Sequence, residues 1–221
     1  MSASTANDRG TAGKWLPLSG AAAVVLVVAS FAGLGGDTPG SGDSAAKISA
    51  YYGSHEAREM IAAFVLAASA PFFVMFGVSL ATSLWPAGAQ RRPVWHGILA
   101  LGSAVAGGAF LIAALIHVAL VGTANNSGVS SGALQALAGL DESSWVAFNG
   151  GLGVLMLGAA GALLARKSSP VLGWIALAAG IALFIPFADF VALIISGLWI
   201  IAVSVKQFRA EPGTVPSPVL A

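Results

Sequence analysis

The sequence predicts an all-α polytopic membrane protein, a helical bundle of six transmembrane helices with both termini in the cytoplasm. The first observation is composition: 57% of the 221 residues are hydrophobic and only 9% are charged, whereas a soluble domain carries about 25% charged residues. The second is a series of long apolar segments, each close to the length of ~20 residues that a spanning helix needs. The third is the distribution of basic residues, which alternates from one loop to the next.

Composition also limits the function. The net charge is +1 and no basic patch with interleaved aromatic residues is present, so we expect no nucleic-acid partner. Cysteine is absent, which excludes disulfides, thiolate metal ligands and cysteine nucleophiles. The lipid bilayer is therefore the first partner that the sequence predicts.

The first four spans follow from hydropathy. A polar leader, residues 1–14, is predicted to be disordered and cytoplasmic. The spans after it are predicted at about 15–35, 60–85, 98–121 and 145–165. Lys14 and the apolar run behind it could also form a cleaved secretory signal, although that run is longer than a signal core of about 7–15 residues. The sequence leaves cleavage of this first span open.

The last apolar segment, Val171 to Val205, must fold back on itself. As one helix it would be about 52 Å long, far more than a bilayer core of about 30 Å. Pro186 and Asp189 interrupt it near the middle. We therefore predict two short helices, at about 171–187 and 188–205, followed by a disordered cytoplasmic tail, 206–221.

The basic residues support six spans. If the N-terminus is cytoplasmic, eight basic residues fall on the inner side and two on the outer side, in agreement with the positive-inside rule. An odd number of spans would break this alternation. The inner residues are Arg9, Lys14, Arg91, Arg92, Arg166, Lys167, Lys206 and Arg209, and the outer ones are Lys47 and Arg58.

Each of the two longer outer loops contains a predicted surface helix. The first, Ser44 to Tyr52, is amphipathic and is expected to lie at the outer membrane interface. Gly53 is expected to end it before the second span begins. The second has the sequence SSGALQALAGL, after which Asp141 or Ser143 is expected to cap the fourth span.

Small residues recur at four-residue spacing in two of the spans. This spacing lets helix backbones approach closely, and it predicts tight packing within the bundle while leaving a homo-oligomer open. The pairs are Gly102 with Ala106, Ser103 with Gly107, and Ala104 with Gly108 in the third span, and Ala147 with Gly151 in the fourth, which also contains Gly158 and Gly161.

Two long stretches of the chain resemble a known group of proteins. They are KISAYYGSHEAREMIAAFVLAASAPFFVMFGVSL and SPVLGWIALAAGIALFIPFADFVALIISGLWIIAVSV. With the basic turn between spans, they are similar to uncharacterised actinobacterial six-pass integral membrane proteins that share a domain of unknown function. The resemblance implies six helices in a bacterial plasma membrane. It implies no active site, because the family has none assigned.

Five polar residues are predicted near the outer ends of the spans. His117 lies four residues from the end of the third span, and Asn149 lies four residues into the fourth. Asp189 lies in the outer turn, and His55 and Glu59 lie where the second span begins. Polar groups at this depth normally face the bundle interior, so we expect one layer of polar side chains, with Asn149 or Asp189 as the partner of His117.

The sequence allows three uses of this layer. It could be a structural hydrogen bond between helices, a ligand or proton site, or a metal site formed by His55, Glu59, His117 and Asp189. The string HEARE lacks the second histidine of the zinc-protease pattern HExxH, so we predict no metal and no cofactor.

Pro71 is the remaining irregularity, because proline inside the second span leaves the carbonyl of Ala67 without its helical partner and predicts a kink. Ser69 is expected to help satisfy the freed backbone. We expect no catalytic residues and a non-enzymatic protein with a cleft for a lipid or small amphipathic ligand near the outer leaflet. The alternatives are a small transporter or proton-coupled carrier, and a metal-dependent membrane enzyme.

Overall fold

The structure, a computed structural model, describes residues 15–35, 38–84, 94–126, 128–167 and 169–210, and over these residues its regular secondary structure is helical, with no strand. Its helices run in the order η1 (Leu16–Leu18), α2 (Ser19–Val28), the π-helix η2 (Ala29–Leu34), α3 (Ala45–Ser83), α4 (Val94–Ala124), α5 (Ser131–Ser143), α6 (Trp145–Arg166), α7 (Pro170–Ala182) and α8 (Asp189–Arg209). The predicted all-α class is confirmed.

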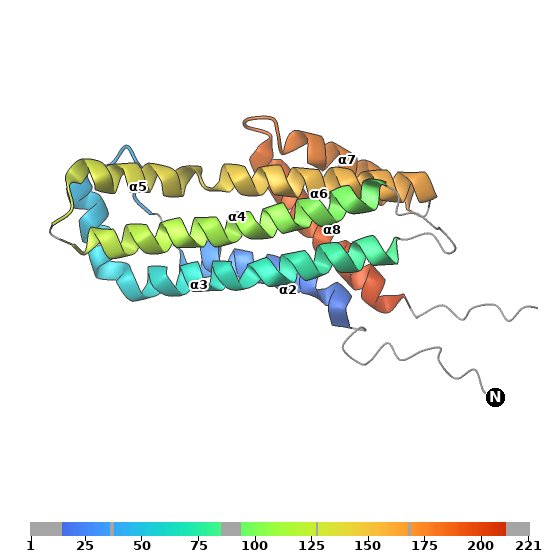
Figure 1. Ribbon diagram of the computed structural model, residues 1–221, viewed down its shortest axis with the longest axis horizontal. Helices are drawn as coiled ribbons and strands as arrows, with labels where there is room; N and C mark the ends of the chain where they lie inside the picture. Colours follow the sequence, from blue (N-terminus) through green and yellow to red (C-terminus); the bar gives the residue numbers. More distant parts are fainter. Residues whose placement is uncertain (1–14, 36–37, 85–93, 127, 168, 211–221) are drawn as a thin grey trace, which may run out of the picture.

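The helices form one elongated bundle. Figure 1 shows α3, α4 and α6 side by side along its length, with α5 continuing the line of α6 at one end. Within the described residues, five helical segments are long and apolar enough to cross a membrane, those of residues 16–34, 45–83, 94–124, 131–166 and 189–209. The chain is therefore a multi-pass membrane protein. Because eight of ten basic residues belong to the other side, we expect the end that carries α5, the α5 end, to face outward.

Two helices are longer than a bilayer is thick. α4 has 31 residues, or about 46 Å of helix, and the part of α3 after its kink at His55, residues 56–83, is about 42 Å long, against a core of about 30 Å. At the α5 end, α5 runs alongside α4 and contacts both helices (Figure 1). A second hydrophobic cluster forms there. It contains Ile48, Tyr52, Leu120, Val121, Ala124, Leu134 and Ala138.

A helix is present where the sequence predicts one at 44–52, and Figure 1 shows it crossing the end of the bundle. Those residues are the first turns of α3, capped by Ser44, whose hydroxyl oxygen accepts from the backbone N–H of Lys47 at 3.3 Å. The backbone leaves helical geometry at His55 (φ −122°, ψ 15°), so a kink just after the predicted end at Gly53 separates these turns from the rest of α3. Ile48 and Tyr52 are fully buried against α4 and α5, so the apolar face covers protein rather than lipid.

The last two helices differ from the predicted pair. The turn lies where Pro186 predicted it, with Phe187 in the left-handed region (φ 72°). α7 has only 13 residues, too few to cross a bilayer core, while α8 has 21 and is not short. Because α8 continues to Arg209, residues 206–209 belong to it and not to the tail. The predicted leader, 1–14, and the remainder of the tail, 211–221, lie outside the described residues.

Glycines set the closest helix contact. A Cβ atom at Gly102 of α4 would overlap the backbone of Leu155 in α6, and one at Gly151 of α6 would overlap the backbone of Ala106. The predicted small-residue spacing therefore serves α4–α6 packing. Gly108, one residue after the tightly packed Gly107, has open space at the same position.

We expect Gly102→Ala to destabilise the protein by about 1–3 kcal/mol, since backbone atoms of α6 cannot move away as a side chain could. Gly108→Ala, the control in the same helix, is expected to be neutral or to stabilise by about 0.5–1 kcal/mol, because alanine favours helix. Thermal unfolding of both purified variants in detergent measures the difference. Equal melting temperatures would contradict the close α4–α6 contact.

Candidate functional site

A buried carboxylate, Glu59, is the centre of the α5 end. It lies on α3 one turn after the non-helical residue His55, and its side chain is 1% exposed. Its Oε1 atom accepts from the Tyr51 hydroxyl at 3.0 Å and from the Arg58 guanidinium at 2.9 Å. Because a buried polar group is unfavourable without partners, these two donors from the same helix are what allow the Glu59 carboxyl group to be buried here.

His117 connects Glu59 to α5. Its Nε2 atom lies 3.3 Å from Oε2 of Glu59, and its Nδ1 atom lies 3.0 Å from Oδ2 and 3.1 Å from Oδ1 of Asp141. The His117 ring packs against the Tyr52 ring in a T-shaped arrangement, with the two ring centroids 5.8 Å apart. Since carboxylates only accept, both contacts are hydrogen bonds when both ring nitrogens carry hydrogen. Arg58, Glu59, His117 and Asp141 then alternate in charge.

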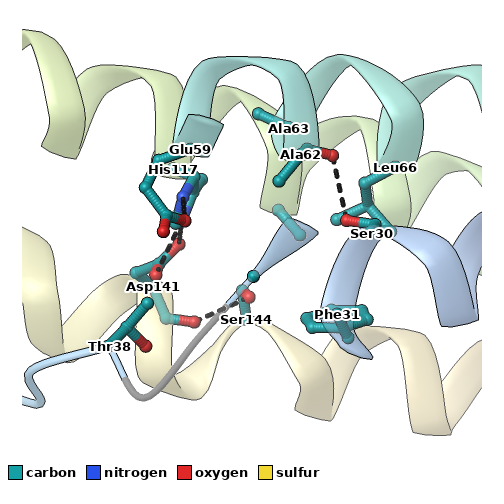
Figure 2. Close-up of a pocket in the computed structure, with 12 residues that line it drawn as sticks. Ser30, Phe31, Thr38, Glu59, Ala62, Ala63, Leu66, His117, Asp141 and Ser144 are labelled. Atoms are coloured by element: carbon teal, nitrogen blue, oxygen red, sulfur yellow. Dashed lines mark hydrogen bonds and ion pairs between the residues drawn. The ribbon is translucent and has the colours of Figure 1, made fainter. Parts of the chain in front are cut away.

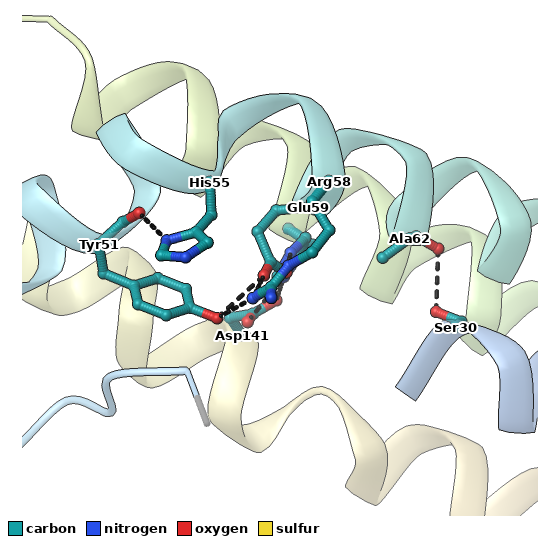
Figure 3. A network of polar contacts seen from close by, with 8 residues as sticks. Ser30, Tyr51, His55, Arg58, Glu59, Ala62 and Asp141 are labelled. Atoms are coloured by element: carbon teal, nitrogen blue, oxygen red, sulfur yellow. Dashed lines mark hydrogen bonds and ion pairs between the residues drawn. The ribbon is translucent and has the colours of Figure 1, made fainter. Parts of the chain in front are cut away.

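Figure 3 shows how Tyr51 and Arg58 complete this cluster. The Arg58 guanidinium also donates to the Tyr51 hydroxyl at 2.6 Å, so three groups of one helix share their hydrogen bonds. His55 stacks on the Tyr51 ring with centroids 4.6 Å apart, and its Nδ1 atom lies 2.9 Å from the Tyr51 carbonyl oxygen. Thus His55 positions Tyr51. Within the described residues, His55 makes no hydrogen bond to Glu59 or His117.

The cluster borders a cavity of about 110 Å³ (Figure 2). Glu59, His117 and Asp141 line one side of it, hydroxyl groups come from Ser30, Thr38 and Ser144, and apolar residues of η2, α3 and α4 form most of the remaining wall. The π-helix η2 turns Ser30 toward α3, where its hydroxyl donates to the Ala62 carbonyl at 2.9 Å. π-helical turns often occur at functional sites because they redirect a side chain.

Asn149 and Asp189 form a separate pair. Asn149 donates through Nδ2 to Oδ2 of Asp189 at 3.3 Å, and both side chains are buried. The prediction that one of them is the partner of His117 was wrong. The α4–α6 contacts of Gly102 with Leu155 and of Gly151 with Ala106 place Asn149 beside Gly108, about 13 Å along α4 from His117.

The error came from the assumed span ends. The sequence analysis treated His117 and Asn149 as equally deep because each lay four residues from a predicted end. In the structure α4 continues beyond the start of α6, so α5 and not α6 lies beside His117. Polar residues of the outer layer therefore divide between two sites.

The metal set is not assembled either. Asp189 is at the other site, and His55 faces the Tyr51 carbonyl. Glu59 and Asp141 contact opposite nitrogens of the His117 ring, so they cannot converge on one ion in this arrangement. No group of three His, Cys, Asp or Glu side chains suited to a metal occurs within the ranges that the structure describes.

Asp141 is the main residue that the sequence analysis misplaced. It does not cap α6, and neither does Ser143, because both belong to α5; Ser144 precedes α6 without a side-chain cap. An amphipathic α5 with its acidic residue one turn before the fourth span was the available signal. Arg58, Tyr51 and Ser30 gave no signal as site residues, since their roles depend on contacts made in the folded chain.

Pro71 lies within α3 without a departure from helical backbone angles at that residue. The Ser69 hydroxyl donates to the carbonyl of Leu66 at 2.6 Å and not to that of Ala67 as expected.

The chain matches no family model, no curated protein and no solved structure.

Proposed function

We propose that this chain is a non-enzymatic protein of a bacterial plasma membrane that binds a small amphipathic molecule at the α5 end. The observation that carries the proposal is the position of a charged cavity directly next to an apolar groove. The cavity would take the polar head of the molecule, and the groove would take its apolar chain.

The groove has a volume of about 290 Å³ and is lined by apolar residues of α2, α3, α4, α6 and α8. Phe73, Phe110 and Phe148 form its floor; the rings of Phe110 and Phe148 stack with centroids 4.2 Å apart. Val24 of α2 and Gly197 of α8 lie across from them. The α8 residues that line the groove lie between Leu193 and Ile201. They are about 6–18 Å along the helix from Asp189, at the depth of lipid chains.

Four helical segments line both the cavity and the groove; on three of them the two spaces are one turn apart, and on α3 the nearest lining residues, Leu66 and Phe73, are two turns apart. On the α2–η2 segment, Phe31 lines the cavity and Val28 lines the groove; on α4 the corresponding pair is Ala113 and Phe110. Ser144 and Phe148 repeat this spacing at α6. Each of these last three pairs is three or four residues apart, which is one helical turn. This spacing supports a single-chain amphiphile that occupies both spaces.

A binding role fits this arrangement better than transport. Carriers usually place functional charges near the bilayer midplane. In the described part of the chain, the buried charged side chains, Glu59 and Asp189, both lie toward the α5 end, and the other buried side chains with polar groups are serines, His96, Asn149, Tyr52 and Trp199. The polar site is thus confined to one leaflet.

Blocking the groove tests the proposal. A Cβ atom at Gly197 would make only an ordinary contact with Val24, 3.7 Å away, so Gly197→Leu should fold and fill the groove. We expect the wild-type protein in phosphatidylcholine nanodiscs to bind dodecyl amphiphiles saturably, as counted by native mass spectrometry, and Gly197→Leu to bind at least tenfold more weakly.

Gly108→Leu is the matched control, because a Cβ atom there meets nothing within 4 Å and that position is not part of the groove. It should bind as the wild type does. If none of dodecanol, dodecylamine and dodecanoate binds saturably to the wild type, or if both leucine variants bind equally, the proposed function is wrong.

A further inference from the structure

The hydrogen-bonding capacity left in the cavity is mainly that of acceptors. The Ser30 hydroxyl donates to the Ala62 carbonyl at 2.9 Å, and the Ser144 hydroxyl donates to the Asp141 carbonyl at 2.8 Å. Each hydroxyl therefore turns its lone pairs, not its hydrogen, to other partners. The carboxylates of Glu59 and Asp141 accept only, and both nitrogens of His117 already face them.

Asp141 is the acceptor with the most remaining capacity. Both of its oxygens face the single Nδ1 atom of His117, whereas a carboxylate has about four lone-pair positions. Glu59 is more fully used, since Tyr51, Arg58 and His117 all contact it. The Asp141 side chain is 19% exposed and lines the cavity, so a ligand can reach it.

Charge favours a cationic head. Arg58 pairs with Glu59 on α3, and His117 on α4 pairs with Asp141 on α5. When the imidazole is neutral, these four groups sum to one negative charge. A head that brings a positive charge and several N–H donors then matches both the charge and the acceptors.

We propose that the amphiphile is a primary amine with one apolar chain, its ammonium held by Asp141, Ser144 and Ser30 and its chain lying in the groove. The inference rests on the proposed function and names its ligand class. The cavity, about 110 Å³, is several times the volume of about 30 Å³ that one water occupies in the liquid, which suffices for an ammonium group with a water. The groove begins one turn away.

The head matters more than the chain for selectivity. Lipid chains are as apolar as the groove, so moving a chain from bilayer to groove gains little from the hydrophobic effect. The charge-assisted hydrogen bonds of an ammonium, by contrast, are about twice as strong as neutral ones. Probes that share a chain and differ in the head therefore test the inference directly.

The experiment compares dodecylamine, dodecanol and dodecanoate on the full chain in phosphatidylcholine nanodiscs, with empty nanodiscs as blank. Concentrations are expressed as mole fraction in the bilayer, because each probe partitions into lipid differently. We expect dodecylamine to bind at least tenfold more tightly than dodecanol, and dodecanoate to bind most weakly. Affinity for the amine should fall between pH 8 and pH 5.5, as a proton on His117 replaces it beside Asp141.

Two variants locate the head. Asp141→Asn should bring the amine within about twofold of the alcohol without changing the alcohol's affinity, and Ser144→Ala should weaken the amine alone by several-fold. Glu142→Gln is the control, because this neighbouring carboxylate is exposed, binds Ser41 and does not line the cavity. If Asp141→Asn fails to fold, the Ser144 comparison decides.

The outcomes separate this inference from the proposed function. Equal binding of amine and alcohol overturns the amine and leaves the amphiphile site intact. Stronger binding of dodecanoate, or an amine preference that Glu142→Gln reduces as much as Asp141→Asn does, also overturns it. Absence of saturable binding by all three probes removes the proposed function itself.

Discussion

Glu59→Gln is expected to lower the free energy of unfolding by about 3 kcal/mol. The substitution keeps the size of the side chain and removes its charge, which leaves Arg58 and His117 facing a neutral amide. Removing one partner of a buried ion pair usually costs about 3–5 kcal/mol, and the lower value applies because the Arg58 side chain is 40% exposed. Chemical or thermal unfolding in detergent, followed by circular dichroism, measures the loss.

Glu56→Gln provides the control for this prediction. Glu56 lies one turn earlier on α3 and is exposed, so its substitution should change stability by no more than about 0.5 kcal/mol. A cycle that adds His117→Gln to Glu59→Gln should give a coupling energy of about 1–3 kcal/mol, as expected for contacting residues. Additive effects would show that the Glu59–His117 contact is not made in the membrane.

The membrane position of the α5 end predicts an all-or-none labelling pattern. The chain has no cysteine, so single cysteines can be introduced without a prior replacement. In intact cells, a maleimide that cannot cross membranes should label Ala136→Cys on α5 and Ala50→Cys on α3, both exposed in the structure. Gln90→Cys, in the loop between the second and third spans, should be labelled only after the membrane is opened.

Leu115→Cys separates exposure to water from exposure to lipid. Leu115 is 68% exposed on α4, but it lies about 9 Å inside the predicted end of that span. It should stay unlabelled in intact membranes and react after unfolding in detergent. Labelling of Gln90→Cys in intact cells together with protection of Ala136→Cys would reverse the orientation, and the binding site would then face the cytoplasm.

Most of the architecture could be predicted from the sequence because hydropathy is a local property. The scarcity of charge, the apolar lengths and the break at Pro186 each depend on neighbouring residues alone, and they gave the helical class and the turn between α7 and α8. The small residues of α4 and α6 likewise predicted close packing, since only small side chains allow backbones to touch.

The site could be predicted only in part. His117 and Glu59 were identified because a titratable side chain in an apolar segment needs a partner. Which partner it finds depends on the relative height of two helices, and hydropathy places helix ends only within a few residues. The displacement of Asn149 from His117 by about two and a half turns shows how far that uncertainty extends.

The sequence by itself therefore determined that this chain crosses a membrane several times and carries polar groups toward one end, because burial of apolar surface in lipid follows from composition and length. Only the tertiary structure decided that α3 kinks at His55, that α4 continues past the start of α6 to lie beside α5, that Asp141 and not Asn149 or Asp189 meets His117, and that a charged cavity lies near an apolar groove. The physical reason is that a contact between distant residues depends on helix register and crossing, and these are fixed by side-chain packing over the whole bundle.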